Sequence, residues 1–509
     1  MITTRCPLLG LTLLLGCGSA VAAAPVATVM PDDIALTVYS SALPGAIPPE
    51  FYRPLPGVPV PTASSLPGYA VVRQERTLRL EAGRSQVRFT DVAALIDPTT
   101  VSFTSLTDAA TRVLEQNFQF DLVSTDKLLQ RYIDRPVTVE RGAASTVAGT
   151  LLSAVDGLVI RATDGGITAV RDYASLRVAE LPGGLITRPT LLWEVNATRA
   201  GEQRTRVTYQ TGGITWWTDY NLTYTAGSDA NHGTVDLAAW VSLINQSGAT
   251  FTDARLKLVA GDVHRAATPA VPRLMTMAAA PQMVQEDTGF TEQSFDEFHL
   301  YTLGRRTTLP ANSTKQLELF DQTRRIPAQR LFVYAPTAGL YGGPAPLLER
   351  EQGARMAARV DSFLVLRNDK ASGLGVPLPA GRIRVSRLDA ADGALEFIGE
   401  DVISHTPKDE TVKVKLGSAF DVVGQRRQVG YTQDTKARWL EEEIEIELRN
   451  HKTEAIEVQV RESLFRSNAA TLVSATVAPQ RPDARTLVFP VKVAADGQTK
   501  LRYKVKYTW

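Results

Sequence analysis

Cysteine is nearly absent from this sequence of 509 residues, which contains only Cys6 and Cys17. A mature chain that begins beyond Cys17 has no disulfide bond and no cysteine nucleophile, so its stability must come from its core. Long apolar runs are absent as well. The run Leu8–Leu15 is well short of the roughly 20 residues that a membrane-spanning helix needs. The sequence therefore predicts no transmembrane segment in the mature protein.

A charge excess of either sign is also missing. The chain has 55 Lys and Arg residues against 54 Asp and Glu residues, for a formal net charge of +1. A nearly neutral protein lacks the positive field that attracts nucleic acid or anionic lipid. We therefore expect no nucleic-acid partner.

The first 24 residues have the pattern of a secretory signal. Arg5 is the only charged side chain before Pro31, the apolar run follows it, and Ser19–Ala24 supplies small residues for cleavage. Two processing routes remain open: Leu14–Cys17 resembles a lipobox that would place a lipid tether on Cys17, and cleavage after Ala22 would release a soluble protein. Either route predicts an exported protein, in the periplasm or tethered to the outer membrane.

Alternation of apolar and polar residues with a period of two dominates the rest of the chain. Clear examples are Thr411–Leu416, Glu443–Leu448 and Leu501–Tyr507, whose charged faces we expect to be solvated. Helical signals are limited to Asp108–Glu115 and Thr125–Tyr132. The pattern predicts an all-β protein of several domains.

Turn-rich stretches divide the chain into blocks. We expect an N-terminal β domain over residues 31–134, with short helices and a surface-loop insertion over 42–69 that is rich in Pro, Gly and Ser. Closely spaced short strands over 135–181 predict a small SH3-like barrel or curled sheet. The turn residues Leu181–Gly184 mark a boundary, and residues 185–509 are expected to form a C-terminal β-sandwich assembly.

From Pro189 to Trp509 the chain resembles the bacterial domain-of-unknown-function family 4139, within a group of mucoidy-inhibitor-like envelope proteins. The residues that carry this resemblance are Pro189–Trp193, 207–216 (VTYQTGGITW), Asp219–Tyr220, 240–245 (WVSLIN), Ser247–Gly248, 256–262 (LKLVAGD), Phe298–Tyr301, 373–381 (GLGVPLPAG) and 405–408 (HTPK). Ile34–Ser40 and Tyr69–Thr104 are similar to the N-terminal domain that often precedes this family. The resemblance implies a β-rich envelope protein, and it implies no reaction, metal or cofactor.

Motifs for catalysis or metal binding are not found. The five histidines, at 232, 264, 299, 405 and 451, have no metal-ligand spacing, and no G-x-S-x-G motif occurs. Ser124–Lys127 matches S-x-x-K but stands where a helix cap is expected. Glu441–Glu443 is interpreted as a solvated strand start, because no calcium-loop motif accompanies it. We assign no catalytic, metal or cofactor residues.

The aromatic residues around position 217 are the one candidate binding surface. Alternation places Trp216, Tyr220 and Tyr224 on one strand face and Trp217 on the other. Core packing on both sides is favoured, and the alternative is that one set is exposed and stacks on sugars or partner chains. Trp193, in an apolar run, is predicted to be structural, with its N–H bonded to a backbone carbonyl.

Two hypotheses for function follow. The first is a non-catalytic envelope interaction or scaffold module with envelope proteins or glycans as partners, and a flat aromatic patch would support it. The second is an envelope hydrolase whose site is assembled from dispersed Asp, Glu and His residues. An exposed carboxylate pair with raised pKa values would support that reading.

Overall fold

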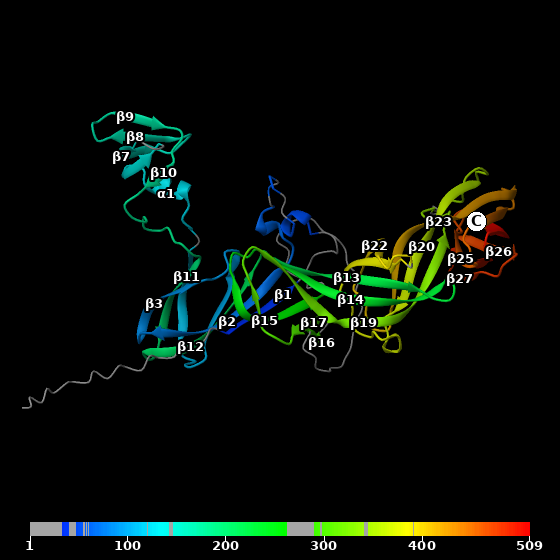
Figure 1. The fold of residues 1–509 in the computed structure, drawn as a ribbon, viewed down its shortest axis with the longest axis horizontal. Coiled ribbons are helices and arrows are strands. Elements are labelled where there is room, and N and C mark those ends of the chain that lie inside the picture. The colour runs from blue at the N-terminus through cyan, green and yellow to red at the C-terminus, as the bar shows by residue number, and fades with distance from the viewer. Residues whose placement is uncertain are drawn as a thin grey trace, which may run out of the picture.

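The computed structural model is built almost wholly from β-strands (Figure 1), as the alternation predicts. It describes residues 33–39, 47–53, 56–57, 59, 61–119, 121–141, 146–261, 290–295, 298–340, 345–389 and 391–509. The predicted signal segment and Cys17 lie outside these residues. Among the described residues, no helix combines the length and the apolar character needed to cross a bilayer.

An eight-stranded sheet joins strands from both sides of the predicted boundary at Leu181–Gly184. Its first strand, β1, pairs in parallel with β15, and β2 pairs with β12 along its whole length. The boundary therefore does not separate two sheets, because pairing partners come from distant parts of the chain. In sheet order the strands are β16 (Phe290–Phe295), β17 (Phe298–Leu303), β15 (Phe251–Ala260), β1 (Asp33–Tyr39), β2 (Tyr69–Leu80), β12 (Gly201–Thr211) and β4 (Ile96–Ser105), with β18 (Thr307–Leu309) paired to β15.

A three-stranded sheet contains Trp193. Its order is β3 (Gly83–Thr90), β11 (Thr190–Ala197) and β5 (Arg112–Gln119). Trp193 is fully buried between Phe89 and Phe103, with ring centroids 5.1 and 5.3 Å away. Its indole Nε1 donates to Oε1 of Gln116 at 2.9 Å, so the expected backbone acceptor is wrong.

The helix predicted at Asp108–Glu115 does not form. Asp108 caps a turn instead: its carboxylate accepts from the Ala110 N–H at 3.1 Å and from the Thr111 hydroxyl at 3.1 Å. The following residues form β5, which pairs with β11. Asp is common both at helix starts and in such turns. Here the residues after the turn pair with β11, and this pairing favours the turn and strand over the helix.

The segment between these strands carries a small separate sheet, which projects from one end of the molecule in Figure 1. The helix α1 (Thr125–Arg131) precedes it, and the Ser124 hydroxyl accepts from the Lys127 N–H at 3.3 Å, which confirms that Ser124 is a helix cap. The strand order is β10 (Ser175–Arg177), β6 (Pro136–Glu140), β7 (Thr146–Ser153), β8 (Leu158–Ala162) and β9 (Ile167–Val170). Among its described residues the end strands β9 and β10 do not pair, so it is a curled sheet and the closed barrel is wrong.

The largest sheet has thirteen strands and extends to the C-terminus. Its order is β22 (Leu395–Ile403), β21 (Gly381–Leu388), β13 (Ile214–Ala226), β14 (His232–Asn245), β19 (Ser313–Tyr334), β20 (Arg355–Arg367), β23 (Thr411–Asp434), β24 (Trp439–Asn450), β29 (Gly497–Thr508) and β26 (Ala469–Ala475). Three further strands are attached to it: β25 (Ile456–Ser463), β28 (Thr486–Val493) and β27 (Gln480–Asp483). Three short 3-10 helices complete the elements: η1 (Pro49–Phe51), η2 (Ala63–Ser65) and η3 (Lys370–Ser372).

Two large hydrophobic cores lie along these sheets. The first includes Trp193 and Trp216, and the second fills the space between β24, β25, β28 and β29. The second core also contains buried ion pairs. The Arg466 Nε donates to Glu442 at 2.7 Å, and the Arg426 Nε donates to Glu462 at 3.0 Å. Glu442 is therefore buried, and the expectation that all of Glu441–Glu443 is solvated is wrong for this residue.

Candidate functional site: an aromatic groove on the outer sheet face

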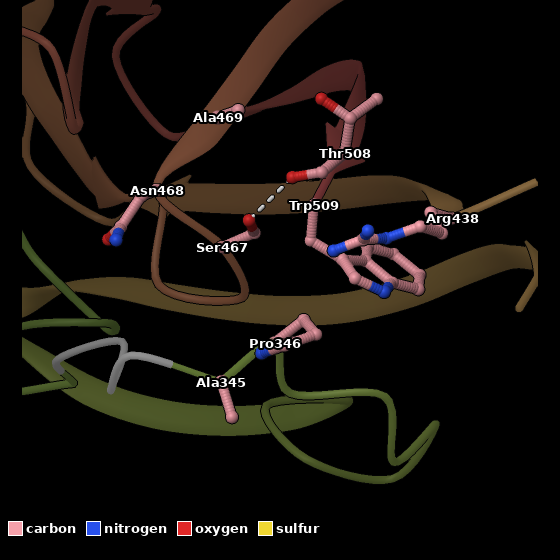
Figure 2. Close-up of a pocket in the computed structure, with 8 residues that line it drawn as sticks. All are labelled: Ala345, Pro346, Arg438, Ser467, Asn468, Ala469, Thr508 and Trp509. Atoms are coloured by element: carbon pink, nitrogen blue, oxygen red, sulfur yellow. Dashed lines mark hydrogen bonds between the residues drawn. The ribbon is translucent and has the colours of Figure 1, made fainter.

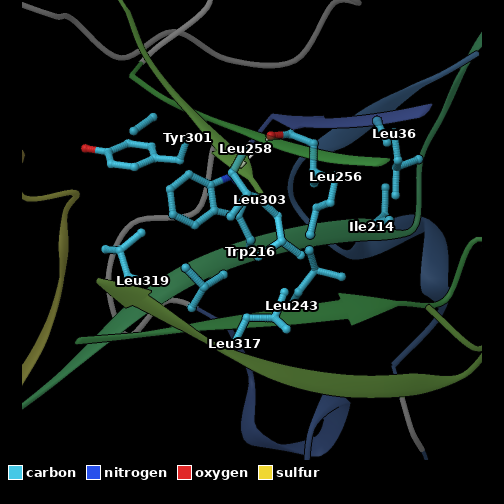
Figure 3. Packing of buried hydrophobic residues seen from close by; sticks show 14 of the residues in the cluster. Leu36, Ile214, Trp216, Leu243, Leu256, Leu258, Tyr301, Leu303, Leu317 and Leu319 are labelled. Atoms are coloured by element: carbon cyan, nitrogen blue, oxygen red, sulfur yellow. Dashed lines mark hydrogen bonds between the residues drawn. The ribbon is translucent and has the colours of Figure 1, made fainter. Parts of the chain in front are cut away.

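The inner face of β13 belongs to the first core. Trp216, Tyr220 and Tyr224 are almost completely buried, and Trp216 packs among leucines and Tyr301 (Figure 3). The Trp216 Nε1 donates to the Val38 carbonyl at 3.2 Å, and the Tyr220 hydroxyl donates to the Pro379 carbonyl at 2.7 Å. Trp216 and Tyr220 are thus structural, and of the three candidate surface residues only Trp217 reaches the outer face.

The outer face places Trp217 close to a second tryptophan. Trp217 pairs with Ser242 across β13 and β14, and Asp219 pairs with Trp240 two positions along. Trp217 and Trp240 are therefore diagonal neighbours on one face, with Cβ atoms about 7 Å apart. Trp217 is half-buried, and Trp240 is 37% exposed.

Asp219 holds the side chains around it in place. One of its carboxylate oxygens, Oδ2, accepts from the Trp217 Nε1 and from the Ser242 hydroxyl, both at 2.8 Å. The other oxygen, Oδ1, lies 3.5 Å from the Arg384 Nη1. Gln316 on β19 extends the network, because its Nε2 donates to the Ser242 hydroxyl at 3.1 Å. The Trp217 ring is thus oriented before any ligand arrives.

Two arginines of β21 close one side of the groove. Arg382 and Arg384 alternate along this strand and share Glu400 of β22, at 3.9 Å and 2.9 Å respectively. The lining itself has two arginines and one carboxylate, Asp219. Glu400, which stands outside the lining, pairs with the arginines and offsets the remaining positive charge.

The opposite wall comes from the described residues of segment 47–68, which lies within the surface-loop insertion predicted over 42–69. Ile47, Phe51 and Leu66 are buried against Ile244 on the outer face of β14. Tyr52 is the residue after Phe51, and its ring packs against the Trp217 ring with centroids 5.4 Å apart. The insertion is therefore anchored to the sheet by its own apolar residues.

Gly68 lets this segment lie directly against β13. Its φ of +102° is in the region that favours glycine, and a Cβ there would lie 2.8 Å from the Thr215 hydroxyl and 2.8 Å from the Tyr39 carbonyl. Any other residue would push the chain away from the strand. The close approach of Gly68 to β13 thus fixes the position at which segment 47–68 joins the start of β2.

Between these walls lies a cavity of about 420 Å³, lined by Tyr52, Trp217, Asp219, Ser242, Thr314, Gln316, Arg382 and Arg384. This volume is in the range of small-ligand sites. Ser242 is buried, and no histidine is among the described residues that line the cavity, so no imidazole there is placed to activate its hydroxyl. The arrangement suits binding through aromatic rings and fixed polar groups.

The sequence of the chain matches the model of one known protein family. Residues 205–509 match the model of the domain of unknown function DUF4139. The chain belongs to the DUF4139 family. No curated protein and no solved structure matches it. The strands β13, β14, β19 and β21 lie inside the matched range, so the floor of the groove belongs to the DUF4139 domain, and Tyr52 comes from outside that range.

The histidines and acidic residues of this DUF4139 chain do not gather into a second site. His232 at the start of β14 pairs with Asp229, and His299 near the start of β17 pairs with Glu292 of β16. Within the described ranges, which do not include His264, no group of three His, Cys, Asp or Glu side chains could hold a metal ion. Burial raises the pKa of Glu462, but this carboxyl is enclosed in the second core and out of reach of a substrate.

A smaller cavity of about 280 Å³ lies near the C-terminal strand (Figure 2). Arg438 and Trp509 lie against each other there, and the Ser467 hydroxyl donates to the Thr508 carbonyl at 2.7 Å. The hydroxyl is therefore engaged in the fold. This cavity lacks the ordered polar network of the groove around Trp217.

Of the residues that line the groove, only Trp217 was expected from the sequence as a site residue. Trp240 on the same sheet face was not singled out either. A signal existed for Trp240, because it alternates with Ser242 on a strand whose other face is apolar. Tyr52 gave no such signal, since only the fold brings its segment onto β13.

Proposed function

We propose that this DUF4139 protein is exported to the cell envelope and acts there as a non-catalytic binding module. One observation carries the binding function: Trp217 and Trp240 face outward as diagonal neighbours beside a cavity of about 420 Å³. The signal pattern in the first 24 residues supports export. Processing at Cys17 or after Ala22 decides whether the module is lipid-tethered or free.

Binding is favoured by how the groove is stabilised. Its aromatic and polar side chains are held by Asp219, Ser242 and Gln316, so little conformational entropy is lost when a ligand binds. The aromatic residues offer large rigid surfaces that are half open to solvent. Ser242, the serine of the described lining, is buried, and the Asp219 oxygen that accepts its hydrogen bond also holds the Trp217 indole; this supports recognition over chemistry.

The experiment is site-specific photo-crosslinking in cells. A photo-reactive residue replaces Trp240, and a second variant carries it at Trp439 on β24, a partly exposed tryptophan far along the sheet. We expect envelope adducts from position 240 and none from position 439. Absence of adducts at 240, or equal yields at both positions, would contradict the proposed binding surface.

A further inference from the structure

We infer that the groove around Trp217 takes an uncharged saccharide chain. This inference rests on the proposed binding function and names its ligand. The candidate ligand classes are nucleotides, peptides and saccharides, and the groove distinguishes among them by ring surfaces, charge and backbone pairing.

The ring surfaces match the apolar faces of sugar rings. Tyr52 and Trp217 tilt against each other at 48°, and Trp240 continues the aromatic row along the same sheet face. A pyranose presents C–H groups on its faces and hydroxyls on its rim. Rings held on a sheet can pack against those faces, while the sugar rim remains free to hydrogen-bond.

The charges favour an uncharged ligand. Both arginines are already paired, Arg384 with Asp219 and Glu400, and Arg382 with Glu400. A phosphate or carboxylate would have to displace Glu400, which lies 2.9 Å from the Arg384 Nε. Neutral hydroxyls can instead share the donors of the arginines and of Gln316 without breaking the ion pairs.

Backbone pairing argues against an extended peptide. β13 lies between β14 and β21, and β14 lies between β13 and β19, so both strands of the groove floor are interior. An added peptide strand requires an exposed sheet edge. A ligand in this groove must therefore be bound by side chains and not by backbone pairing. Saccharides are bound in this way.

The test is equilibrium binding of the full mature chain to uncharged tetrasaccharides of glucose and of N-acetylglucosamine, by calorimetry. We expect at least one probe to bind with a dissociation constant on the order of 1 mM or tighter. Trp217→Ala and Trp240→Ala should each weaken binding by about tenfold or more. Trp439→Ala is the matched control and should leave binding unchanged.

Asp219→Asn tests how much the polar network around Asp219 contributes to saccharide affinity, apart from stacking on the aromatic rings. It keeps the shape but removes the charge that pairs with Arg384, so we expect weaker binding and a gain of affinity for a carboxylated tetrasaccharide such as oligogalacturonate. If neither neutral probe binds while position 240 still crosslinks, the saccharide inference is wrong and the binding function stands. Preference of the parent protein for oligogalacturonate would overturn the inference of an uncharged ligand.

Discussion

Arg466 is a fully buried charge, and Arg466→Met tests how the second core is held together. Its side chain is 0% exposed. The Nε donates to Glu442, and the two terminal nitrogens donate to the carbonyls of Leu347, Glu349, Arg350 and Gln352. One guanidinium thus neutralises a buried carboxylate and fastens the segment 347–352 to the core.

The magnitude follows from what the substitution leaves behind. Glu442 would remain buried with only the Tyr507 hydroxyl, 3.1 Å away, as a donor. Stranding one member of a buried ion pair costs about 3–5 kcal/mol. The freed carbonyls belong to a segment, 347–352, whose residues are exposed or partly exposed, so water can replace the guanidinium there. We expect Arg466→Met to lower the free energy of unfolding by about 3–5 kcal/mol.

The assay is urea unfolding followed by tryptophan fluorescence, which Trp439 and Trp509 report from this part of the chain. Arg427→Met is the control, because Arg427 is 52% exposed and Glu445, although itself 0% exposed, keeps Arg502 and Lys500 as partners. Its cost should be smaller than that of Arg466→Met, since Glu445 is not left without a cation.

The double variant Arg466→Met/Glu442→Gln provides the decisive comparison. Removing the stranded carboxylate should restore part of the loss. The reasoning is refuted if Arg466→Met costs no more than Arg427→Met, or if the double variant is less stable than Arg466→Met alone.

Three further predictions concern other parts of the chain. Trp193→Ala should cost about 3–5 kcal/mol and Trp193→Phe much less, since Phe keeps most of the buried volume; thermal melts of the two variants compare them. The hydrogen bond from Arg427 holds the pKa of Glu445 below its ordinary value of 4.5. The stabilisation from this pair is therefore fully present above pH 4.5 and is lost as pH falls through the lowered pKa of the folded state. Glu445→Gln should therefore flatten the acid dependence of the melting temperature, and an unchanged slope would contradict this. Mass spectrometry of the mature protein should find a start at acylated Cys17 or near Ala23, and an intact Met1 would contradict the proposed export.

The local structure was predictable where it depends on neighbouring residues. Thr411–Leu416, Glu443–Leu448 and Leu501–Tyr507 all lie within strands, because alternation reports directly on strand geometry. The expectation that their charged faces are solvated is wrong for Glu445, which is buried beneath Arg427 and Arg502. The parallel pairing of β1 with β15 was not predictable, since more than 200 residues separate the partners in the sequence. Strand order depends on such distant contacts, and so the predicted boundary at Leu181–Gly184 did not separate two sheets.

For the candidate site as well, the features that depend on neighbouring residues were predictable and those that depend on distant contacts were not. The separation of Trp216 from Trp217 follows from the period of two, and the structure assigns Trp216 to the core and Trp217 to the outer face. The partners of Trp217 depend on register: Ser242 is placed opposite it by strand pairing, and Tyr52 by the packing of segment 47–68. A single sequence contains the residues of this groove but not their positions relative to one another.

The long strands raise the question of whether the groove and the buried ion pairs act as one unit. β19 contributes Leu317 and Leu319 to the first core and Phe332 to the second, and β23 likewise reaches both. The groove lies over the first core, and Arg466 lies in the second. Hydrophobic contacts are short-ranged, so a cavity or stranded charge in one core disturbs the packing of the other only through these shared strands. Arg466→Met should therefore lose stability while the folded protein keeps its affinity for ligand at the groove, and a parallel loss of both would mean that the two cores unfold and bind as a single unit.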